Sequence, residues 1–130
     1  MTDAAWDTDT PVQAVVLPGG MPGTLHWESS PVVRGTVMHA VQSDALLCAI
    51  CAAPSVLGKW ELLRGRRATC YPGFEEYLIG AAVQEAAVVE DGRFIPARGA
   101  GAALDFGFAI VSRLADSDTA ASLRVAMQCR

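Results

Sequence analysis

The segment LLCAICAAPSVLG, residues 46–58, holds two cysteines within one apolar run. Cys48 falls inside the stretch 45–50, which has the length and composition of a buried strand. Cys51 falls where that strand must turn into a helix, which is predicted to begin just after it and to end near Trp60. A strand followed at once by a helix is the unit from which parallel sheets are built. The segment therefore predicts an α/β fold and gives its two cysteines different positions.

Apolar runs alternate with segments of helical spacing along the rest of the chain, which is typical of a parallel sheet covered on both faces. Further strands are predicted at residues 12–17 and 67–70, and at 86–89 and 93–96 on either side of the turn pair Asp91-Gly92. Further helices are predicted at 31–42, 101–114 and 119–127. Only residues 1–10 have the character of a tail, so we expect a single domain over 11–130.

Composition excludes several classes of function. The chain is 52% hydrophobic and 18% charged, so it can bury a core, and its net charge of −4 argues against a nucleic-acid partner. No apolar run reaches the roughly 18 to 20 residues that cross a bilayer, and the acidic start MTDAAWDTDT does not resemble a signal peptide. We therefore expect no membrane association, a cytoplasmic location, and free thiols at Cys48, Cys51, Cys70 and Cys129.

Cys51 is the predicted nucleophile. A nucleophile on a sharp strand-to-helix turn needs small neighbours two residues away on either side, and Ala49 and Ala53 supply them. The turn also places the thiol at the N-terminus of the next helix, where thiolate is favoured. Cys48 is predicted to fill the core. A thioredoxin-type pair is a weaker interpretation because it needs both cysteines at a helix start, and a zinc site lacks a second ligand pair, so no metal is expected.

Four motifs carry a family resemblance. They are VVLPGGMPG at 15–23, AICAAP at 49–54, ATCYPGFEEYL at 68–78 and RGAGAALDF at 98–106. In order and spacing they resemble the ThiJ/PfpI family, also called the Parkinson-disease protein deglycase family. The resemblance implies a flavodoxin-like, class I glutamine amidotransferase-like sandwich with a doubly wound parallel sheet. It covers nearly everything from Val12 to the end of the chain.

The resemblance also implies a site and a chemistry. It matches Cys51 to a cysteine on a nucleophile elbow, and it assigns oxyanion or substrate binding to Gly19, Gly20 and Ala52, with Tyr71 beside them. Consecutive glycines fit that role because they let main-chain donors approach a developing alkoxide. Family members are described as glyoxalases or deglycases that need no cofactor, as redox sensors, or as chaperones. The implied partners are a small dicarbonyl or glycated substrate and a second copy of the chain.

The first departure from the family pattern concerns histidine. Members with a Cys-His pair carry the histidine at the position of Tyr71, whereas His26 and His39 both precede Cys51. We expect His26 in a loop and His39 on a helix face, both turned to solvent. A triad-type amidase or peptidase is therefore disfavoured because the cysteine lacks a base. Tyr71 either donates a hydrogen bond to substrate or packs at the turn before Pro72.

The second departure concerns the start of the domain. Family domains place a strand, a helix and further strands before VVLPGG, and that region supplies a glutamate beside the cysteine. The chain resembles the C-terminal two-thirds of the domain, apparently truncated at the N-terminus, and none of its own glutamates matches that position. The strand at 12–17 should then present an unpaired apolar edge, to be covered by a second copy or a complementing N-terminal chain.

Three hypotheses for function follow. The first is a glyoxalase or deglycase in which Cys51 attacks the aldehyde carbon of a dicarbonyl. It is weakened by the missing carboxylate that would carry the proton. The second is a redox sensor in which Cys51 is oxidised and Cys70 could act as a resolving thiol. The third is an inactive remnant with an intact core.

Overall fold

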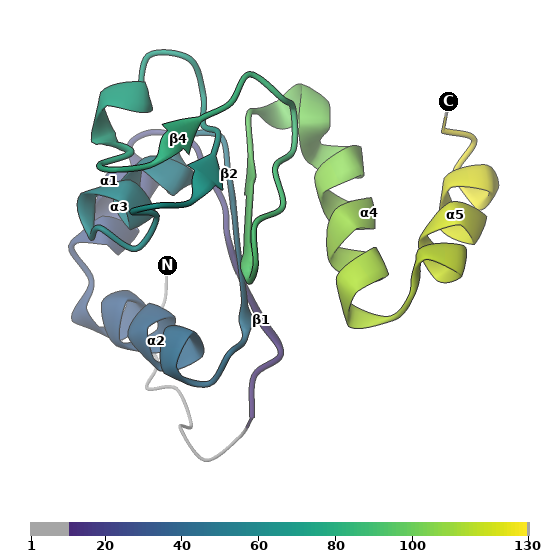
Figure 1. Ribbon diagram of the computed structural model, residues 1–130, viewed down its shortest axis with the longest axis horizontal. Helices are drawn as coiled ribbons and strands as arrows, with labels where there is room; N and C mark the ends of the chain where they lie inside the picture. The colour runs from purple at the N-terminus through teal and green to yellow at the C-terminus, as the bar shows by residue number, and fades with distance from the viewer. Residues whose placement is uncertain (1–10, 130) are drawn as a thin grey trace.

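The computed structural model describes residues 11–129, and its centre is a three-stranded parallel sheet (Figure 1). The strands β1 (Ala14–Leu17), β2 (Leu46–Ile50) and β5 (Phe94–Ala97) lie in the order β1-β2-β5. Val16 aligns with Cys48 across the first pair, and Cys48 aligns with Ile95 across the second. The carboxyl ends of the three strands therefore meet at one edge, which in open parallel sheets is where ligands bind.

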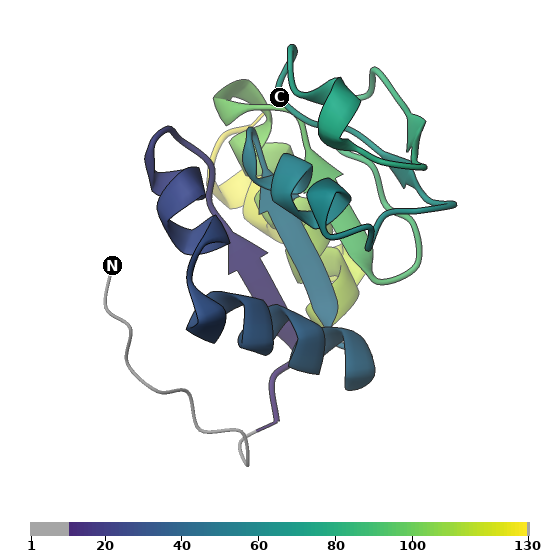
Figure 2. The same ribbon diagram turned by 90° about the vertical axis from the view of Figure 1, so that its left-hand side faces the viewer.

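Three helices cover one face of the sheet (Figures 1 and 2): α1 (Gly23–Glu28), α2 (Pro31–Gln42) and α3 (Ala53–Lys59). The larger core cluster lies between them and the strands, and it includes Leu17, Leu47, Ala49, Val37 and Leu57. Helix α2 begins where predicted because the Ser30 hydroxyl accepts the backbone N–H of Val33 and Pro31 occupies the first turn.

Helix α4 (Ala103–Leu114) covers the other face, and α5 (Ser117–Ala126) packs on its outer side (Figure 1). A short 3-10 turn, Ala100–Ala102, leads from the sheet into α4. The core cluster on this face includes Leu46, Cys48, Ile95 and Phe106. Because consecutive strand residues point to opposite faces, Cys48 packs toward α4 while its neighbours Leu47 and Ala49 pack toward the first three helices. The result is the predicted three-layer, flavodoxin-like sandwich.

A second sheet of only two short parallel strands stands apart from the first. It pairs β3 (Arg67–Ala68) with β4 (Ala82–Val83), and a 3-10 helix, Glu75–Tyr77, lies between them in the chain. The strand predicted at 67–70 thus exists but is shorter. The hairpin around Asp91-Gly92 is reduced to two isolated antiparallel bridges, Val88 with Ala97 and Asp91 with Phe94, so the strand predicted at 86–89 did not form.

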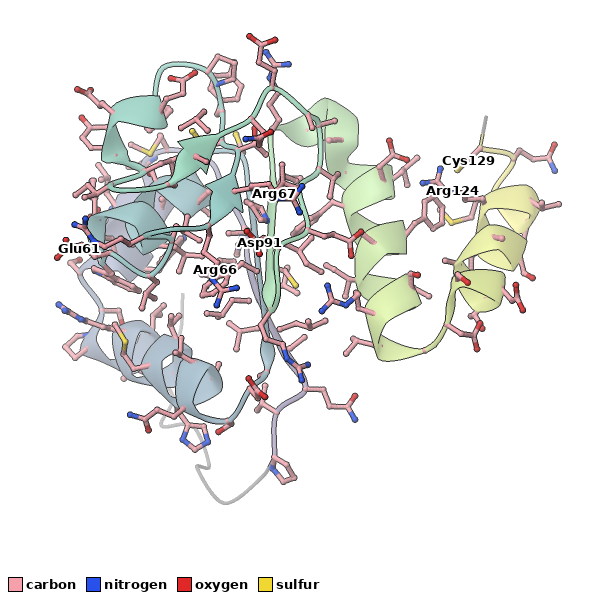
Figure 3. All side chains as sticks on the ribbon, viewed as in Figure 1. Glu61, Arg66, Arg67, Asp91, Arg124 and Cys129 are labelled. Carbon is pink, nitrogen blue, oxygen red and sulfur yellow. The ribbon has the colours of Figure 1, made fainter. Side chains whose placement is uncertain are left out.

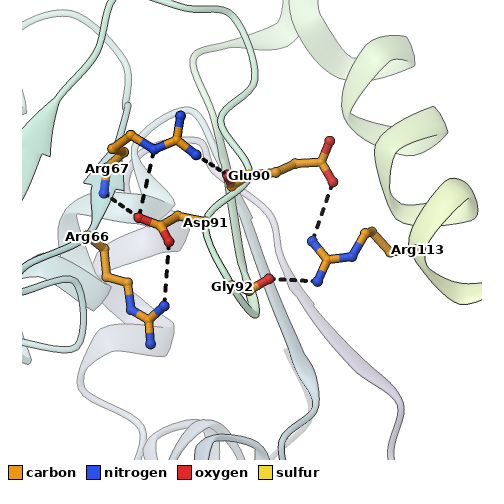
Figure 4. Close-up of polar contacts among 6 residues, drawn as sticks. All are labelled: Arg66, Arg67, Glu90, Asp91, Gly92 and Arg113. Atoms are coloured by element: carbon orange, nitrogen blue, oxygen red, sulfur yellow. Dashed lines mark hydrogen bonds and ion pairs between the residues drawn. The ribbon is translucent and has the colours of Figure 1, made fainter.

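Charged side chains fix this hairpin to the elements around it (Figure 4). The Asp91 carboxylate accepts the backbone N–H of Arg67 at 2.8 Å and lies 3.5 Å from the Arg66 guanidinium. Arg113, at the end of α4, donates to the Gly92 carbonyl at 2.7 Å and pairs with Glu90 at 3.5 Å. The turn before β5 is therefore held from two sides by arginines.

Strand β1 forms the open edge of the sheet. Leu17 is buried, but Val16, which points to the α4 side, is 52% exposed. The continuous apolar run 14–17 predicts a strand buried on both faces, and within the described residues only β2 pairs with it. The predicted tail, residues 1–10, lies outside the described residues. No helix in the described part of the chain is long and apolar enough to cross a membrane.

Candidate functional site

Cys51 occupies a strained position at the carboxyl end of β2. Its φ of 65° lies in the left-handed region, which is uncommon for residues other than glycine. Two backbone hydrogen bonds hold it there: its N–H donates to the Ala97 carbonyl at 3.0 Å, and its own carbonyl accepts the N–H of Tyr71 at 2.8 Å. Cys51 is half-buried. Strain held in place by surrounding bonds, with the side chain reaching solvent, is the geometry of a nucleophile elbow.

Gly19 packs directly against the elbow. A Cβ at this position would lie 2.6 Å from the Cβ of Cys51 and 2.7 Å from the Ile50 carbonyl oxygen. Side chains do not approach so closely, so only glycine fits. The absence of a side chain at Gly19 lets the main chain of the glycine turn lie close to Cys51. Ala52 lies on the same side, since a Cβ on Gly19 would also come within 3.2 Å of its backbone nitrogen.

The turn at 18–20 is tied to helix α1. Gly20 has a φ of 90°, and its carbonyl accepts both the N–H and the hydroxyl of Thr24, at 2.9 and 2.8 Å. The Trp27 indole donates to the Pro18 carbonyl at 3.2 Å, and its ring meets Trp60 edge-on at 6.2 Å between centroids. The peptide bond between residues 21 and 22 is cis. Helix α1 was not predicted, and it serves to anchor this turn.

Helix α3 continues from the elbow into the core. Ala52 is buried and forms its N-cap, and residues 53–58 are buried without interruption. Gly58 is needed because a Cβ there would collide with the backbone of Tyr77 and Leu78. The helix is seven residues long and ends at Lys59 with Trp60 as its C-cap, close to its predicted end. The elbow is therefore supported by a short, fully packed helix that cannot shift easily.

Tyr71, whose backbone N–H donates to the Cys51 carbonyl, opens onto a cavity of about 430 Å³ that Cys51 itself does not line. Its side chain is 48% exposed, and its ring lies 3.5 Å from where a Gly99 Cβ would be. Arg98 and the small residues 99–102 form the other wall. The ring also meets Phe74 edge-on at 6.4 Å. The ring of Tyr71 therefore packs at the turn before Pro72, and a hydrogen bond from its hydroxyl to substrate stays a prediction.

The Arg98 and Gly99 wall was not among the predicted site residues. Its signal was present in the motif RGAGAALDF, which directly follows β5. Because β5 lies beside β2 in a parallel sheet, its carboxyl end must open at the same edge as Cys51. That inference needs the strand order, which the sequence alone does not supply.

Two of the other three cysteines, Cys48 and Cys70, are buried, whereas Cys129 is half-buried like Cys51. Burial raises the pKa of Cys48 to about 12, although the charge of Arg113 works in the opposite direction. Burial, together with the nearby charges of Glu75 and Cys51, raises the pKa of Cys70 to about 11. Cys129 lies beside α5, on the side of α4 that faces away from the sheet (Figure 3). All four thiols are free.

Both histidines lie on helices, and several carboxylates form ion pairs. His26 is exposed but lies in helix α1, not in a loop as predicted, and His39 is half-buried on α2. Several carboxylates have partners of their own: Glu28 with Lys59, Glu61 with Arg64, and Glu90 with Arg113. Among residues 11–129, no group of three or more His, Cys, Asp or Glu side chains could hold a metal ion.

Comparison with known proteins places this geometry in a family. The model of the DJ-1/PfpI family matches residues 1–113. "Protein DJ-1 homolog B" of Arabidopsis thaliana is 35% identical over 115 residues, covering 87% of this chain and 26% of that protein. A deglycase of Pyrococcus horikoshii is 33% identical over 101 residues, covering 74% of this chain and 60% of that protein. The chain therefore spans about a quarter of the Arabidopsis protein and about three-fifths of the Pyrococcus protein.

A solved structure gives the same result in three dimensions. The DJ-1 superfamily protein of Salmonella typhimurium superposes with a TM-score of 0.89 at 30% identity. The superposition covers 95% of this chain and 68% of that one. The sheet and the helices on both of its faces are therefore shared with that protein.

Proposed function

The chain belongs to the DJ-1/PfpI family, and on that premise we propose that it converts a small dicarbonyl such as methylglyoxal, or a glycated adduct of one, without a cofactor. Cys51 is the proposed nucleophile. The observation that carries the proposal is the elbow itself, a half-buried cysteine at φ 65° with Gly19 packed against it. The name of the Pyrococcus deglycase, at 33% identity, supports the same chemistry.

The reaction begins with attack of the Cys51 thiolate on the aldehyde carbon. A carbon–sulfur bond forms and the carbonyl oxygen becomes an alkoxide. We assign the backbone N–H groups of Gly19, Gly20 and Ala52 as hydrogen-bond donors to this alkoxide. Transfer of the aldehyde hydrogen to the neighbouring carbon gives a thioester, and water then releases a hydroxy acid and the thiol. The sum is dicarbonyl plus water to hydroxy acid, so no external oxidant or reductant is needed.

Tyr71 and the cavity beside it form the proposed substrate pocket. The cavity of about 430 Å³ has room for a small dicarbonyl, and its wall of small residues at 99–102 leaves space beside the phenol. We assign the Tyr71 hydroxyl to a hydrogen bond with the second carbonyl group of the substrate. Arg98, exposed at the rim, suits the carboxylate that the reaction produces.

We assign the role of proton carrier to none of the ion-paired glutamates. Glu28, Glu61 and Glu90 are each paired with a basic side chain elsewhere. We propose that a carboxylate enters from another segment or another chain that docks along the open edge of β1, either a second copy or a complementing N-terminal chain. The exposed Val16 on that edge supports such docking. The four free thiols support a reducing, cytoplasmic location.

The test is consumption of methylglyoxal, measured with and without a chelator, with the product identified by mass spectrometry. Cys51→Ser should abolish turnover, while Cys129→Ser, which changes a thiol beside α5, should leave it unchanged. Turnover that survived Cys51→Ser, or that vanished with the chelator and returned with zinc, would refute the proposal.

A further inference from the structure

A second thiol lies next to the elbow. The N–H of Tyr71 donates a hydrogen bond to the Cys51 carbonyl at 2.8 Å. Cys70 directly precedes Tyr71 in the chain and therefore lies close to Cys51. Standard backbone dimensions then keep the Cα atoms of Cys51 and Cys70 within about 7.5 Å. Disulfides span Cα distances of roughly 4.4 to 6.8 Å, so the pair lies inside or close to that range.

Cys48, the cysteine nearest to Cys51 in sequence, is too far away to form a disulfide with it. Three residues of extended strand separate its Cα from that of Cys51 by roughly 10 Å. Its side chain is also fully buried against α4, in the cluster with Ile95 and Phe106. The spacing C-x-x-C therefore does not make a redox pair here, and the partner comes from the neighbouring strand.

The surroundings of Cys70 connect it both to Cys51 and to solvent. Cys70 is 3% exposed and belongs to the core cluster on the α1–α3 side. It also lines a cavity of about 310 Å³ together with Glu75, Glu85 and Arg98. The pKa of Cys70 is raised by burial, then by the charge of Glu75, and last by the charge of Cys51.

We propose that Cys70 is the resolving thiol of Cys51, so that a hydroperoxide converts the pair to an intrachain disulfide. The Cys51 thiolate attacks the peroxide, the O–O bond breaks, and Cys51 becomes a sulfenic acid while the peroxide leaves as hydroxide or alkoxide. The Cys70 thiolate then attacks the Cys51 sulfur, the S–O bond breaks, and the departing hydroxide takes up a proton as water. An added dithiol restores both thiols. The inference rests on the proposed reactivity of Cys51 but not on dicarbonyl turnover.

The second step should depend on pH because it requires the Cys70 thiolate. With a pKa of about 11, the thiolate fraction rises about tenfold per pH unit through neutrality, so disulfide closure should accelerate by that factor. Besides burial, the charges of Glu75 and Cys51 raise the pKa of this thiol, and the charged side chains of Glu85 and Arg98 line the same cavity. Glu75→Gln should lower the pKa of Cys70 and speed closure, whereas Glu76→Gln on the same short helix should not.

The experiment treats the chain with one equivalent of hydrogen peroxide, blocks remaining thiols, and maps peptides without reduction. The expected product links the peptides of Cys51 and Cys70, and Cys129→Ser should not change it. Cys70→Ala and Cys70→Ser should instead accumulate a sulfenic acid on Cys51 that dimedone traps. Over-oxidation of Cys51 in the unaltered chain with Cys70 still open to alkylation, or a link to Cys48 or Cys129, would overturn the proposal.

The outcomes separate this inference from the proposed function. A chain that forms the disulfide but does not consume methylglyoxal, even with a family N-terminal segment fused ahead of Val12, supports the inference and refutes the dicarbonyl chemistry. A chain that consumes methylglyoxal but never links the two cysteines does the reverse. Because mapping is done on the unaltered chain, the result does not depend on whether a Cys70 variant folds.

Discussion

Different interactions fix the residues at the two ends of the parallel sheet. At the amino end of β5, the turn around Asp91 is fixed by side-chain charges from Arg66, Arg67 and Arg113 (Figure 4). At the carboxyl end of β2, Cys51 is fixed by backbone hydrogen bonds and by the close approach of Gly19. If one ion pair around Asp91 is lost, the others still hold the turn. The elbow has no comparable set of side-chain ion pairs.

The proposed function accounts for this difference. A bound aldehyde needs open space and main-chain donors beside the thiol, and long charged side chains would fill that space and perturb the nucleophile. The amino end binds nothing in the proposed mechanism, so it can use exposed ion pairs, which contribute little individually. Changes at the elbow should therefore have large effects, and changes at the turn around Asp91 should have small ones.

The largest expected effect comes from completing the elbow. Fusing an N-terminal segment of a family relative ahead of Val12 should pair the β1 edge and supply the carboxylate. Methylglyoxal turnover should then rise by about 10² to 10⁴, the usual contribution of one general acid-base group. Size-exclusion chromatography should show less self-association at the same time. Replacing the segment's glutamate with glutamine should remove the rate gain alone; equal rates with and without the segment would mean that the elbow is already complete.

A methyl group on Gly19 should damage the elbow next most severely. Gly19→Ala places a Cβ 2.6 Å from the Cys51 Cβ, and overpacking of this kind costs about 1 to 3 kcal/mol of unfolding free energy. The rate of Cys51 alkylation should change with it, because the elbow must move. Urea unfolding and timed iodoacetamide labelling provide the measurements.

Gly35→Ala is the matched control for that change. Gly35 lies inside α2 with open space around its Cβ position, so alanine should stabilise the helix by about 0.5 to 1 kcal/mol and leave labelling unchanged. If Gly19→Ala behaved like Gly35→Ala, the close approach at the elbow would not be needed.

The backbone strain at Cys51 predicts a smaller effect. A residue with a Cβ in the left-handed region costs roughly 1 to 2 kcal/mol relative to glycine, part of which glycine's greater unfolded-state freedom offsets. Cys51→Gly should therefore be at least as stable as Cys51→Ala by thermal unfolding, although both lack the nucleophile. A clearly less stable Cys51→Gly would show that the conformation carries no strain.

Asp91→Asn tests the charged end and should have the smallest effect. The N–H of Arg67, followed by the charges of Arg66 and Arg67, holds the pKa of Asp91 below its ordinary value. A lowered folded-state pKa stabilises the protein above the unfolded-state pKa, and this contribution is lost as the pH falls through the folded-state value. The variant should thus be slightly less stable near neutral pH and match the unaltered chain at about pH 2. Urea midpoints across this range, with Glu61→Gln as an exposed-pair control, will show whether the gap closes in acid.

Local signals predicted the parts of the fold that depend on neighbouring residues. Helix α2 was predicted with its observed bounds because Ser30 and Pro31 mark its start. The elbow followed from the position of Cys51 between a strand and a helix. The short helix α1 and strand β4 were missed, because six and two residues are too few to show a period and owe their form to tertiary contacts.

The functional roles of the candidate site residues stay predictions. Cys51 was predicted from its position after a strand and Gly19 from the family resemblance, and the two residues follow the adjacent strands β2 and β1. The Ala97 carbonyl that receives the Cys51 N–H, and the Arg98 wall of the cavity, reach the elbow only because β5 pairs with β2. Such contacts depend on strand order, which local sequence does not encode.

The Trp27 anchor has an optical consequence. Its indole N–H donates a hydrogen bond to the carbonyl of Pro18, and its ring lies edge-on to that of Trp60. Two aromatic rings in fixed, chiral contact give a near-ultraviolet circular dichroism band that depends on their mutual angle. Any ligand that moves the glycine turn would alter this band, so the protein carries an intrinsic spectroscopic reporter beside the proposed nucleophile.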